Sequence, residues 1–230
     1  QNTGGASYGY FFSKELRVNV NYGTGFKAPS FYDLYYPNYG VTTIKPERSQ
    51  NTEAGIHYET VPYDIHFVVY NNTISNLIQY TSLGCPVGYS MGCASNVASA
   101  KITGASLGGV SRIGDFTLKG SFDQQNPVDQ STGYVLAKRA KQFGNVSVEY
   151  KKNAYVVGAE GTFQAQRYDY GNTGLMNGYG IANLYGSYDF AKDWSLFARW
   201  NNIFNKNYQL NYGYVTPGSN VFVGIRYAMK

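Results

Sequence analysis

Charged residues are scarce in this chain. They make up 14% of its 230 residues, whereas soluble domains average roughly 25%. Aromatic residues make up 17%, and most of them are tyrosines. This balance favours a protein that presents apolar and aromatic side chains to lipid over a soluble β-sandwich or open sheet.

Long hydrophobic runs are also missing. No stretch of about eighteen apolar residues occurs, which excludes a transmembrane helix. No signal peptide opens the sequence, because residues 4–12 already have the pattern of a strand, and we expect the chain to start inside a longer protein. We find no linker, shift in composition or internal repeat, and we expect residues 1–230 to form one all-β unit.

Motifs for catalysis and for cofactor binding are absent from the sequence. It has no phosphate-cradling glycine loop, no metal-ligand spacing and no paired carboxylates. The two histidines, His57 and His66, lack the Ser and Asp of a nucleophilic arrangement, and we expect structural roles for both. The net charge of +5 is dispersed without a basic stripe. We therefore expect no enzyme activity, no metal site, no cofactor and no nucleic-acid partner.

What the sequence does have is alternation of apolar and polar residues. In a segment around residue 160, one face carries Tyr155, Val157, Ala159, Gly161, Phe163 and Ala165. The other face carries Val156, Gly158, Glu160, Thr162, Gln164 and Gln166. Only a β-strand gives a period of two. Segments of about ten such residues are typical of a transmembrane β-barrel, with one face toward lipid and one toward the lumen.

The alternation defines about eleven segments. They cover residues 4–12, 15–25, 50–60, 65–80, 96–110, 116–126, 138–150, 154–168, 179–190, 194–205 and 219–229. Short and long connections alternate between them, as in outer-membrane barrels with short periplasmic turns and long outer loops. Several tyrosines lie near segment ends, where an aromatic girdle would meet the membrane interfaces: Tyr22, Tyr58, Tyr150, Tyr168 and Tyr227.

The turn at residues 61–64 allows a register to be predicted. If Thr60 lies opposite Ile65, the apolar residues of both strands share one face. The predicted pairs are Tyr58 with Phe67, Ile56 with Val69, and Glu59 with His66. In the segment around residue 198, Ala198 and Trp200 are expected on the lipid face and Phe197 on the lumen face.

Four motifs support a family resemblance. GFKAP occupies residues 25–29, IKPERS residues 44–49, NNIFNKNY residues 201–208 and YGY residues 212–214. In this order the chain resembles TonB-dependent outer-membrane receptors. Its spacing and the KRAKQ motif at residues 138–142 are most similar to the cobalamin (vitamin B12) transporters of that superfamily.

The resemblance implies a barrel of about 22 strands plugged by an N-terminal hatch domain. This chain would be the C-terminal half of the barrel, an all-β transmembrane antiparallel unit, with the hatch and the TonB-contacting segment upstream. The family usually ends on an aromatic residue, so the Tyr227-Ala228-Met229-Lys230 ending puts Lys230 in doubt as the native terminus. Expected partners are TonB, outer-membrane lipid and lipopolysaccharide, and a small-molecule nutrient.

Candidate functional residues lie in the long connections. Cys85 and Cys93 bracket PVGYSMG, and in an oxidising compartment we expect them to form a disulfide. Tyr32, Tyr35 and Tyr36 lie in a Tyr-rich stretch that could form an aromatic wall for a large ligand or an upper girdle.

By resemblance, the YGY motif places Tyr212 and Tyr214 at the substrate, with Tyr214 in contact. It also places Lys138 or Arg139, at the start of KRAKQ, near the substrate. Alternatively, these two cations meet lipopolysaccharide phosphates or lumen carboxylates. The predicted function is TonB-dependent uptake of a scarce bulky nutrient, most like cobalamin. The alternatives are a receptor for haem, a metal chelate or a siderophore, a passive porin-like or surface-binding barrel, and an outer-membrane hydrolase.

Overall fold

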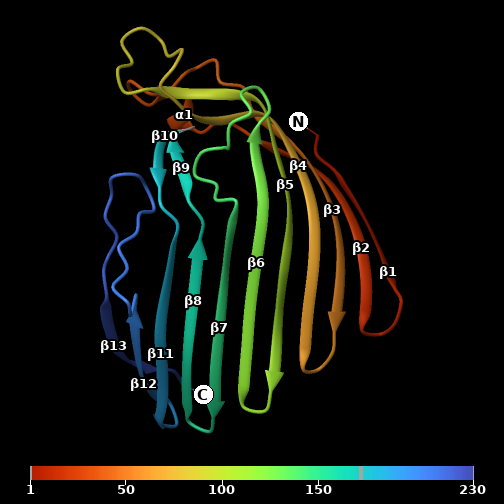
Figure 1. The fold of residues 1–230 in the computed structure, drawn as a ribbon, viewed down its shortest axis with the longest axis vertical. Helices are drawn as coiled ribbons and strands as arrows, with labels where there is room; N and C mark the ends of the chain where they lie inside the picture. The colour runs from red at the N-terminus through yellow and green to blue at the C-terminus, as the bar shows by residue number, and fades with distance from the viewer. Residues whose placement is uncertain (1, 171–172, 230) are drawn as a thin grey trace.

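The computed structural model describes residues 2–170 and 173–229, so Gln1 and Lys230 lie outside the described residues. One curved sheet of eleven antiparallel strands dominates it (Figure 1). Its strands are β1 (Gly5–Phe11), β2 (Leu16–Lys27), β3 (Glu47–Glu59), β4 (Tyr63–Thr81), β5 (Cys93–Ile113), β6 (Phe116–Asp129), β7 (Gln142–Lys152), β8 (Tyr155–Gln164), β11 (Tyr179–Ala191), β12 (Trp194–Asn201) and β13 (Asn220–Tyr227). A separate hairpin comprises β9 (Arg167–Tyr170) and β10 (Thr173–Met176), and a one-turn helix, α1, spans Phe31–Tyr35.

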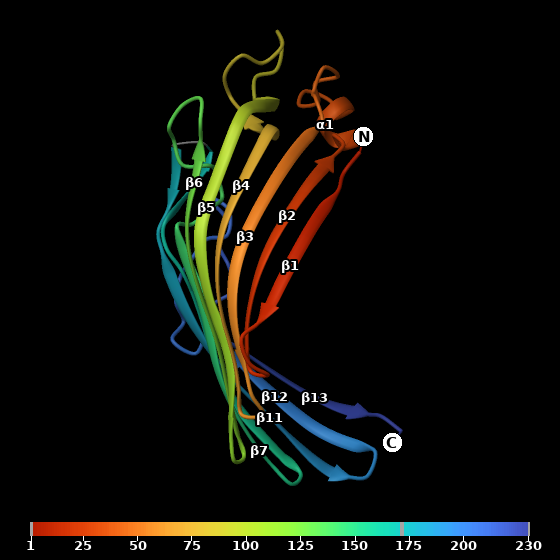
Figure 2. The same ribbon diagram turned by 90° about the vertical axis from the view of Figure 1, so that its right-hand side faces the viewer.

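Each strand of the large sheet pairs with its neighbour along the chain, except that β8 pairs with β11 because β9 and β10 leave the sheet. Short turns join the strands at one end and long connections at the other (Figure 1). The sheet is curved like part of a barrel wall and is not closed (Figure 2). None of the helical residues described is part of a stretch long and apolar enough to cross a membrane. The predicted all-β meander of eleven antiparallel strands is confirmed.

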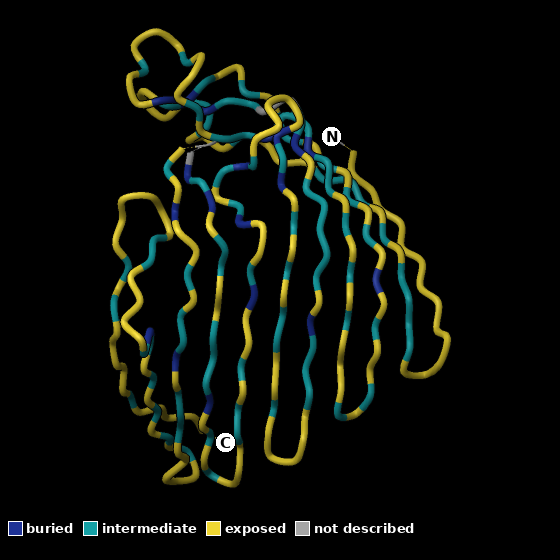
Figure 3. The backbone as a smooth tube through the Cα atoms, in the orientation of Figure 1, coloured by how far each residue is buried: buried dark blue, intermediate teal, exposed yellow. Residues whose placement is uncertain are grey.

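The two faces of the sheet differ as the alternation predicts. Val157, Gly186, Ala198 and Val223 form one row across four strands. On the opposite face Glu160 accepts hydrogen bonds from Arg199 and from Asn183. Buried residues gather toward the end with the long connections, while the turns are exposed (Figure 3).

An aromatic girdle lines the end with the short turns. Three pairs of rings contact each other across neighbouring strands, with centroids 4.6–4.9 Å apart: Phe116 with Tyr150, Tyr155 with Tyr188, and Trp194 with Tyr227. Offset and tilted rings at this spacing add to the area that they bury. Tyr150 and Tyr227 therefore lie where the sequence predicts them. The prediction for Tyr168 is wrong, because this residue belongs to β9 of the small hairpin.

Three predicted segment boundaries are wrong. β7 begins at Gln142 and not at 138, because Lys138 has a φ of 61° and its N–H bonds to the Tyr168 carbonyl. β8 ends at Gln164 and does not reach 168. β12 ends at Asn201, because the side chain of Asn202 bonds both the N–H and the C=O of Lys206 and turns the chain. Local side-chain hydrogen bonds of this kind compete with strand pairing.

The predicted register of the β3–β4 hairpin is wrong by two residues. The structure pairs Ile56 with Phe67, His57 with His66 and Tyr58 with Ile65. The turn is tighter than predicted because the N–H and the side-chain oxygen of Thr60 both contact the backbone of Tyr63. A shift of two residues keeps every side chain on its predicted face.

The facing of β12 can be tested in lipid with Ala198→Arg. Ala198 lies between Gly186 and Val223 on the apolar face, and a cation there should lower the free energy of unfolding by about 2–4 kcal/mol near the bilayer midplane. Ser147→Arg is the control, because Ser147 pairs with Glu160 on the polar face. Urea unfolding in lipid bilayers measures both. Equal stability of the two variants would contradict the facing.

Candidate functional site

The long connections gather at one end of the sheet, which we call the mouth. It comprises residues 28–46 with α1, residues 82–92, residues 130–141, the β9–β10 hairpin and residues 202–219, which we call the terminal loop. β4 and β5 extend further than their neighbours and support the mouth (Figure 1). All of the substrate-binding residues predicted from the sequence lie in these connections.

Helix α1 forms because Ser30 caps it. The Ser30 hydroxyl accepts a hydrogen bond from the Asp33 N–H at 3.2 Å, and the Asp33 carboxylate accepts one from the Ser30 N–H at 2.8 Å. This reciprocal pattern is a capping box. Residues four apart share a face of the helix, so the rings of Tyr32 and Tyr36 approach to 4.4 Å and those of Phe31 and Tyr35 to 5.0 Å. The sequence did not predict this helix, but the Ser and Asp three residues apart are the signal for it.

A third tyrosine joins this cluster. The ring of Tyr39 lies 4.7 Å from that of Tyr32, and we call Tyr32, Tyr36 and Tyr39 the tyrosine cluster. Burial raises the pKa of Tyr39, and the nearby Asp33 carboxylate raises it further, so the phenol stays protonated. The cluster therefore offers aromatic faces and neutral hydroxyl groups at the mouth.

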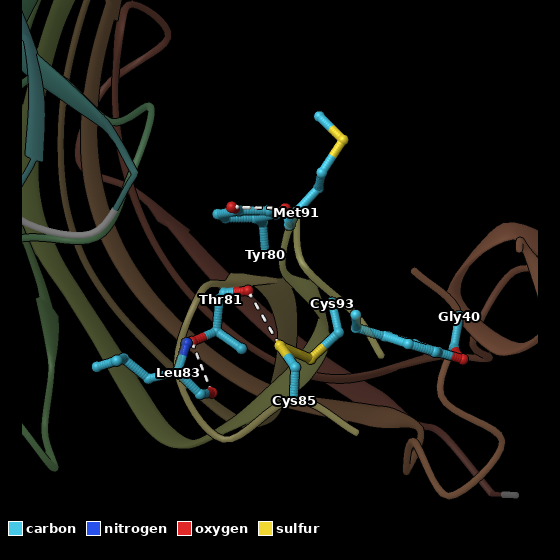
Figure 4. Close-up of a disulfide and its surroundings, with 8 residues drawn as sticks. Gly40, Tyr80, Thr81, Leu83, Cys85, Met91 and Cys93 are labelled. Atoms are coloured by element: carbon cyan, nitrogen blue, oxygen red, sulfur yellow. Dashed lines mark hydrogen bonds between the residues drawn. A yellow bond between two sulfur atoms is a disulfide. The ribbon is translucent and has the colours of Figure 1, made fainter. Parts of the chain in front are cut away.

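The disulfide-closed segment supports the tyrosine cluster from the side. Cys85 and Cys93 are bonded, as predicted, with their Cα atoms 5.7 Å apart (Figure 4). The Tyr89 hydroxyl donates to the Gly40 carbonyl at 2.9 Å, and the Ala94 N–H donates to the Tyr39 carbonyl at 2.9 Å. The disulfide thus holds a segment that hydrogen-bonds the two residues ending the tyrosine stretch.

Residues 130–141 fold against the sheet around one buried side chain. Leu136 packs with Ile74, Leu77 and Ala100, and its N–H donates to the Pro127 carbonyl at 2.9 Å. Arg139 is half-buried, and burial lowers its pKa while the charge of Glu47 opposes that shift. Its guanidinium donates to the Ala137 carbonyl at 3.2 Å.

Lys138 and the terminal loop meet at β9. The Lys138 ammonium lies 3.2 Å from a carboxylate oxygen of Asp169 and donates to the Asn211 side chain at 3.3 Å. The second Asp169 oxygen accepts from the Tyr212 N–H at 2.9 Å. Lys138 therefore has a carboxylate partner, whereas Arg139 is directed at a backbone carbonyl. Tyr212 is 49% exposed and Tyr214 is 70% exposed, so both rings are open to a ligand.

The structure brings only part of the predicted set together. Lys138, Tyr212 and Tyr214 share one neighbourhood. The helix that carries Tyr32, Tyr35 and Tyr36 lies over the β2–β3 side of the mouth, away from the cyan β9–β10 hairpin (Figure 2). The sequence missed Arg167 and Asp169. The signal for them is a pair of opposite charges two residues apart, which places both on one face of a short strand.

A cavity of about 430 Å³ lies between the β9–β10 hairpin and the terminal loop. Its lining is mostly neutral and includes three carboxamides, from Asn177, Asn207 and Gln209, with one cation from Lys206. No group of three or more His, Cys, Asp or Glu residues able to hold a metal occurs within residues 2–170 and 173–229. The mouth offers hydrogen bonds and aromatic surface to a ligand.

The support of the tyrosine cluster can be tested with the double variant Cys85→Ser/Cys93→Ser. Without the disulfide the free energy that constrains residues 82–92 should fall by about 2–3 kcal/mol, and the bonds to Tyr39 and Gly40 should open more often. Hydrogen–deuterium exchange of residues 39–45 should accelerate. Exchange in the terminal loop is the internal control, and unchanged exchange at residues 39–45 would refute the supporting role.

Comparison with known proteins identifies relatives along nearly the whole chain. A family model described as "TonB dependent receptor-like, beta-barrel" matches residues 1–203. The chain is 29% identical over 232 residues to the "Vitamin B12 transporter BtuB" of Vibrio vulnificus (strain YJ016), covering 98% of this chain and 37% of that protein. It is 28% identical over 208 residues to the protein of the same name from Photobacterium profundum, covering 90% and 34%. The chain thus spans little more than a third of the length of these relatives.

Solved structures with the same fold have several different ligands in their titles. The "Copper transporter OprC" superposes with a TM-score of 0.83 at 18% identity, covering 99% of this chain and 39% of that one. The ferric enterobactin receptor PfeA of Pseudomonas aeruginosa gives 0.78 at 18% identity, covering 98% and 40%. The ferripyoverdine receptor of the outer membrane of Pseudomonas aeruginosa gives 0.76 at 15% identity, covering 97% and 32%. At these identities the likeness shows the fold alone.

The eleven-stranded meander, its lipid-type and polar faces and the family match over residues 1–203 agree with one another. The chain belongs to the TonB-dependent receptor β-barrel family and forms part of the wall of an outer-membrane barrel.

Proposed function

We propose that the receptor containing this chain takes up cobalamin across the outer membrane by TonB-dependent active transport. The single observation that carries the proposal is the match over 98% of the chain to a vitamin B12 transporter at 29% identity. In this proposal residues 1–230 form the C-terminal portion of one barrel domain. Strands outside the chain pair with β1 and β13, because an open sheet edge in lipid leaves backbone groups without partners. A hatch domain outside the chain contacts TonB.

The chemistry of the mouth supports a large ligand of low charge. Tyr214 and Tyr212 present exposed rings, and Tyr32, Tyr35 and Tyr36 add an aromatic surface on the other side. Lys27 and Lys138 are already paired with Glu47 and Asp169. An anionic ferric siderophore would be expected to need several unpaired cations close together, whereas cobalamin presents amide groups and a broad apolar face. Aromatic and hydrogen-bonding contacts suit the second ligand.

Two alternatives belong to other functional classes or ligand classes. Haem, metal-chelate and siderophore receptors have the same architecture, as the relatives named for copper and enterobactin illustrate. A passive or surface-binding barrel would have the same wall without energised transport. Ligand titration and cellular uptake separate these alternatives from the proposal.

Equilibrium titration of the intact receptor with cyanocobalamin tests the ligand. We expect tight binding that changes little with salt, because few charged contacts are formed. Tyr214→Ala should weaken the affinity by about tenfold or more, as the loss of an exposed aromatic contact residue does. Tyr134→Ala, which removes another exposed mouth tyrosine, should change it less than about twofold. Tight binding of a ferric chelate without cobalamin binding would overturn the ligand and leave the receptor class intact.

Uptake of labelled cyanocobalamin by cells tests the mode of transport. In cells that have TonB we expect accumulation against a gradient, and in cells without TonB we expect binding at the surface without accumulation. A passive pore would give equal entry in both strains and no accumulation. That result would refute active transport even if the titration showed cobalamin binding.

A further inference from the structure

Four consecutive residues of the terminal loop are each bound by a charged side chain from elsewhere in the chain. Arg167 donates to the Gln209 carbonyl at 3.0 Å and to the Leu210 carbonyl at 3.2 Å. Lys138 donates to the Asn211 side chain, and Asp169 accepts from the Tyr212 N–H. These contacts leave residues 209–212 with little freedom to move relative to β9.

The three charged residues are themselves held firmly. Arg167 is 5% exposed, and the Asp169 side chain is fully buried. Burying a charge is costly unless ion pairs and hydrogen bonds compensate for the lost water. Both residues lie on the same face of β9, because they are two positions apart in a strand. Tyr168 between them pairs with Leu175 of β10 and accepts the Lys138 N–H through its carbonyl at 2.6 Å.

Lys138 adopts a backbone conformation that suggests a specific task. Its φ of 61° lies in the left-handed region, which side chains with a Cβ rarely occupy. This conformation lets its N–H reach Tyr168 while its ammonium reaches Asp169 and Asn211. Strained residues of this kind persist where the surrounding structure requires them.

The position of Tyr214 follows from the residues that are held. The Tyr214 N–H donates to the Asn211 carbonyl at 3.2 Å, and Gly213 between them has a φ of 80°. A positive φ at the third residue is typical of a type II turn. Tyr214 therefore ends a turn whose first two residues are bound by Lys138 and Asp169.

We propose that Arg167 and Asp169 are positioning residues that fix the terminal loop, and that Lys138 couples this loop to residues 130–141. We call the three residues the β9 clamp. The inference rests on the proposed function in one respect, since it takes Tyr214 as a ligand contact. The clamp holds Tyr214 in its binding orientation before the ligand arrives, and this preorganisation reduces the entropy lost on binding.

Hydrogen–deuterium exchange of the intact receptor without ligand tests the clamp directly. Asp169→Ala should accelerate exchange at residues 209–214 by about ten- to a hundredfold, because the Tyr212 N–H loses a charged acceptor. Asp115→Ala is the matched control, since Asp115 pairs with Lys152 at 3.5 Å in a turn at the opposite end of the sheet. Exchange in β11 and β12 should stay unchanged in both variants.

A second variant tests the coupling without burying or exposing a charge. Lys138→Asn keeps a residue type that tolerates the left-handed conformation and removes the ammonium. Exchange should accelerate in residues 209–214, by less than in Asp169→Ala because Asp169 still accepts the Tyr212 N–H. The clamp is overturned if both variants leave residues 209–214 unchanged, or if β11 and β12 accelerate equally, since that would indicate general destabilisation.

The affinity for cyanocobalamin tests whether the clamp acts through Tyr214. Asp169→Ala should weaken binding by about tenfold, mainly by faster dissociation, and should weaken it little further when Tyr214→Ala is already present. Full additivity of the two changes would refute action through Tyr214. If the intact receptor binds no cyanocobalamin, the proposed substrate fails, while the exchange experiment still decides whether the clamp exists.

Discussion

The structure depends on one constraint, which is that every backbone N–H and C=O facing lipid must find a partner within the sheet. Antiparallel pairing of neighbouring strands meets this constraint for β2 to β12, and the two-residue alternation then gives one apolar and one polar face. The same constraint explains why β9 and β10 leave the sheet without opening it. β8 pairs directly with β11 over ten residue pairs, from Tyr179 with Gln164 to Tyr188 with Tyr155. A hairpin can therefore be inserted at the mouth without loss of wall pairing.

Because the wall is fixed by pairing, specificity is left to the connections at the mouth. Each of them is held by a different device. Ser30 and Asp33 cap the helix that carries Tyr32 and Tyr36, and the disulfide between Cys85 and Cys93 holds the neighbouring segment against it. Leu136 anchors residues 130–141 in a small core. Loops held in this way can present ligand-binding groups in defined positions, as loops on a rigid scaffold commonly do.

Charge at the mouth is used largely inside the protein. Lys27 pairs with Glu47, which also accepts a hydrogen bond from the Ile78 N–H, and Lys138 pairs with Asp169. Arg167 is directed at backbone carbonyls. Buried or half-buried pairs of this kind fix geometry more than they add stability. What remains exposed toward a ligand is mainly aromatic and hydroxyl surface, which is the property that links the fold to the proposed capture of a large, weakly charged nutrient.

The sequence by itself determined the class of fold, the eleven strands of the wall, the faces of their side chains, the disulfide and the family, because alternation with period two and short motifs are local signals. It did not determine the β3–β4 register, since a shift by two residues preserves every face. It also did not reveal the β9 clamp, because Lys138, Asp169 and Tyr212 are separated by 31 and 43 residues along the chain and meet only after the strands pair. Tertiary structure alone decided that Lys138 bonds a buried carboxylate, and that the tyrosines of α1 and those of the terminal loop occupy different sides of the mouth.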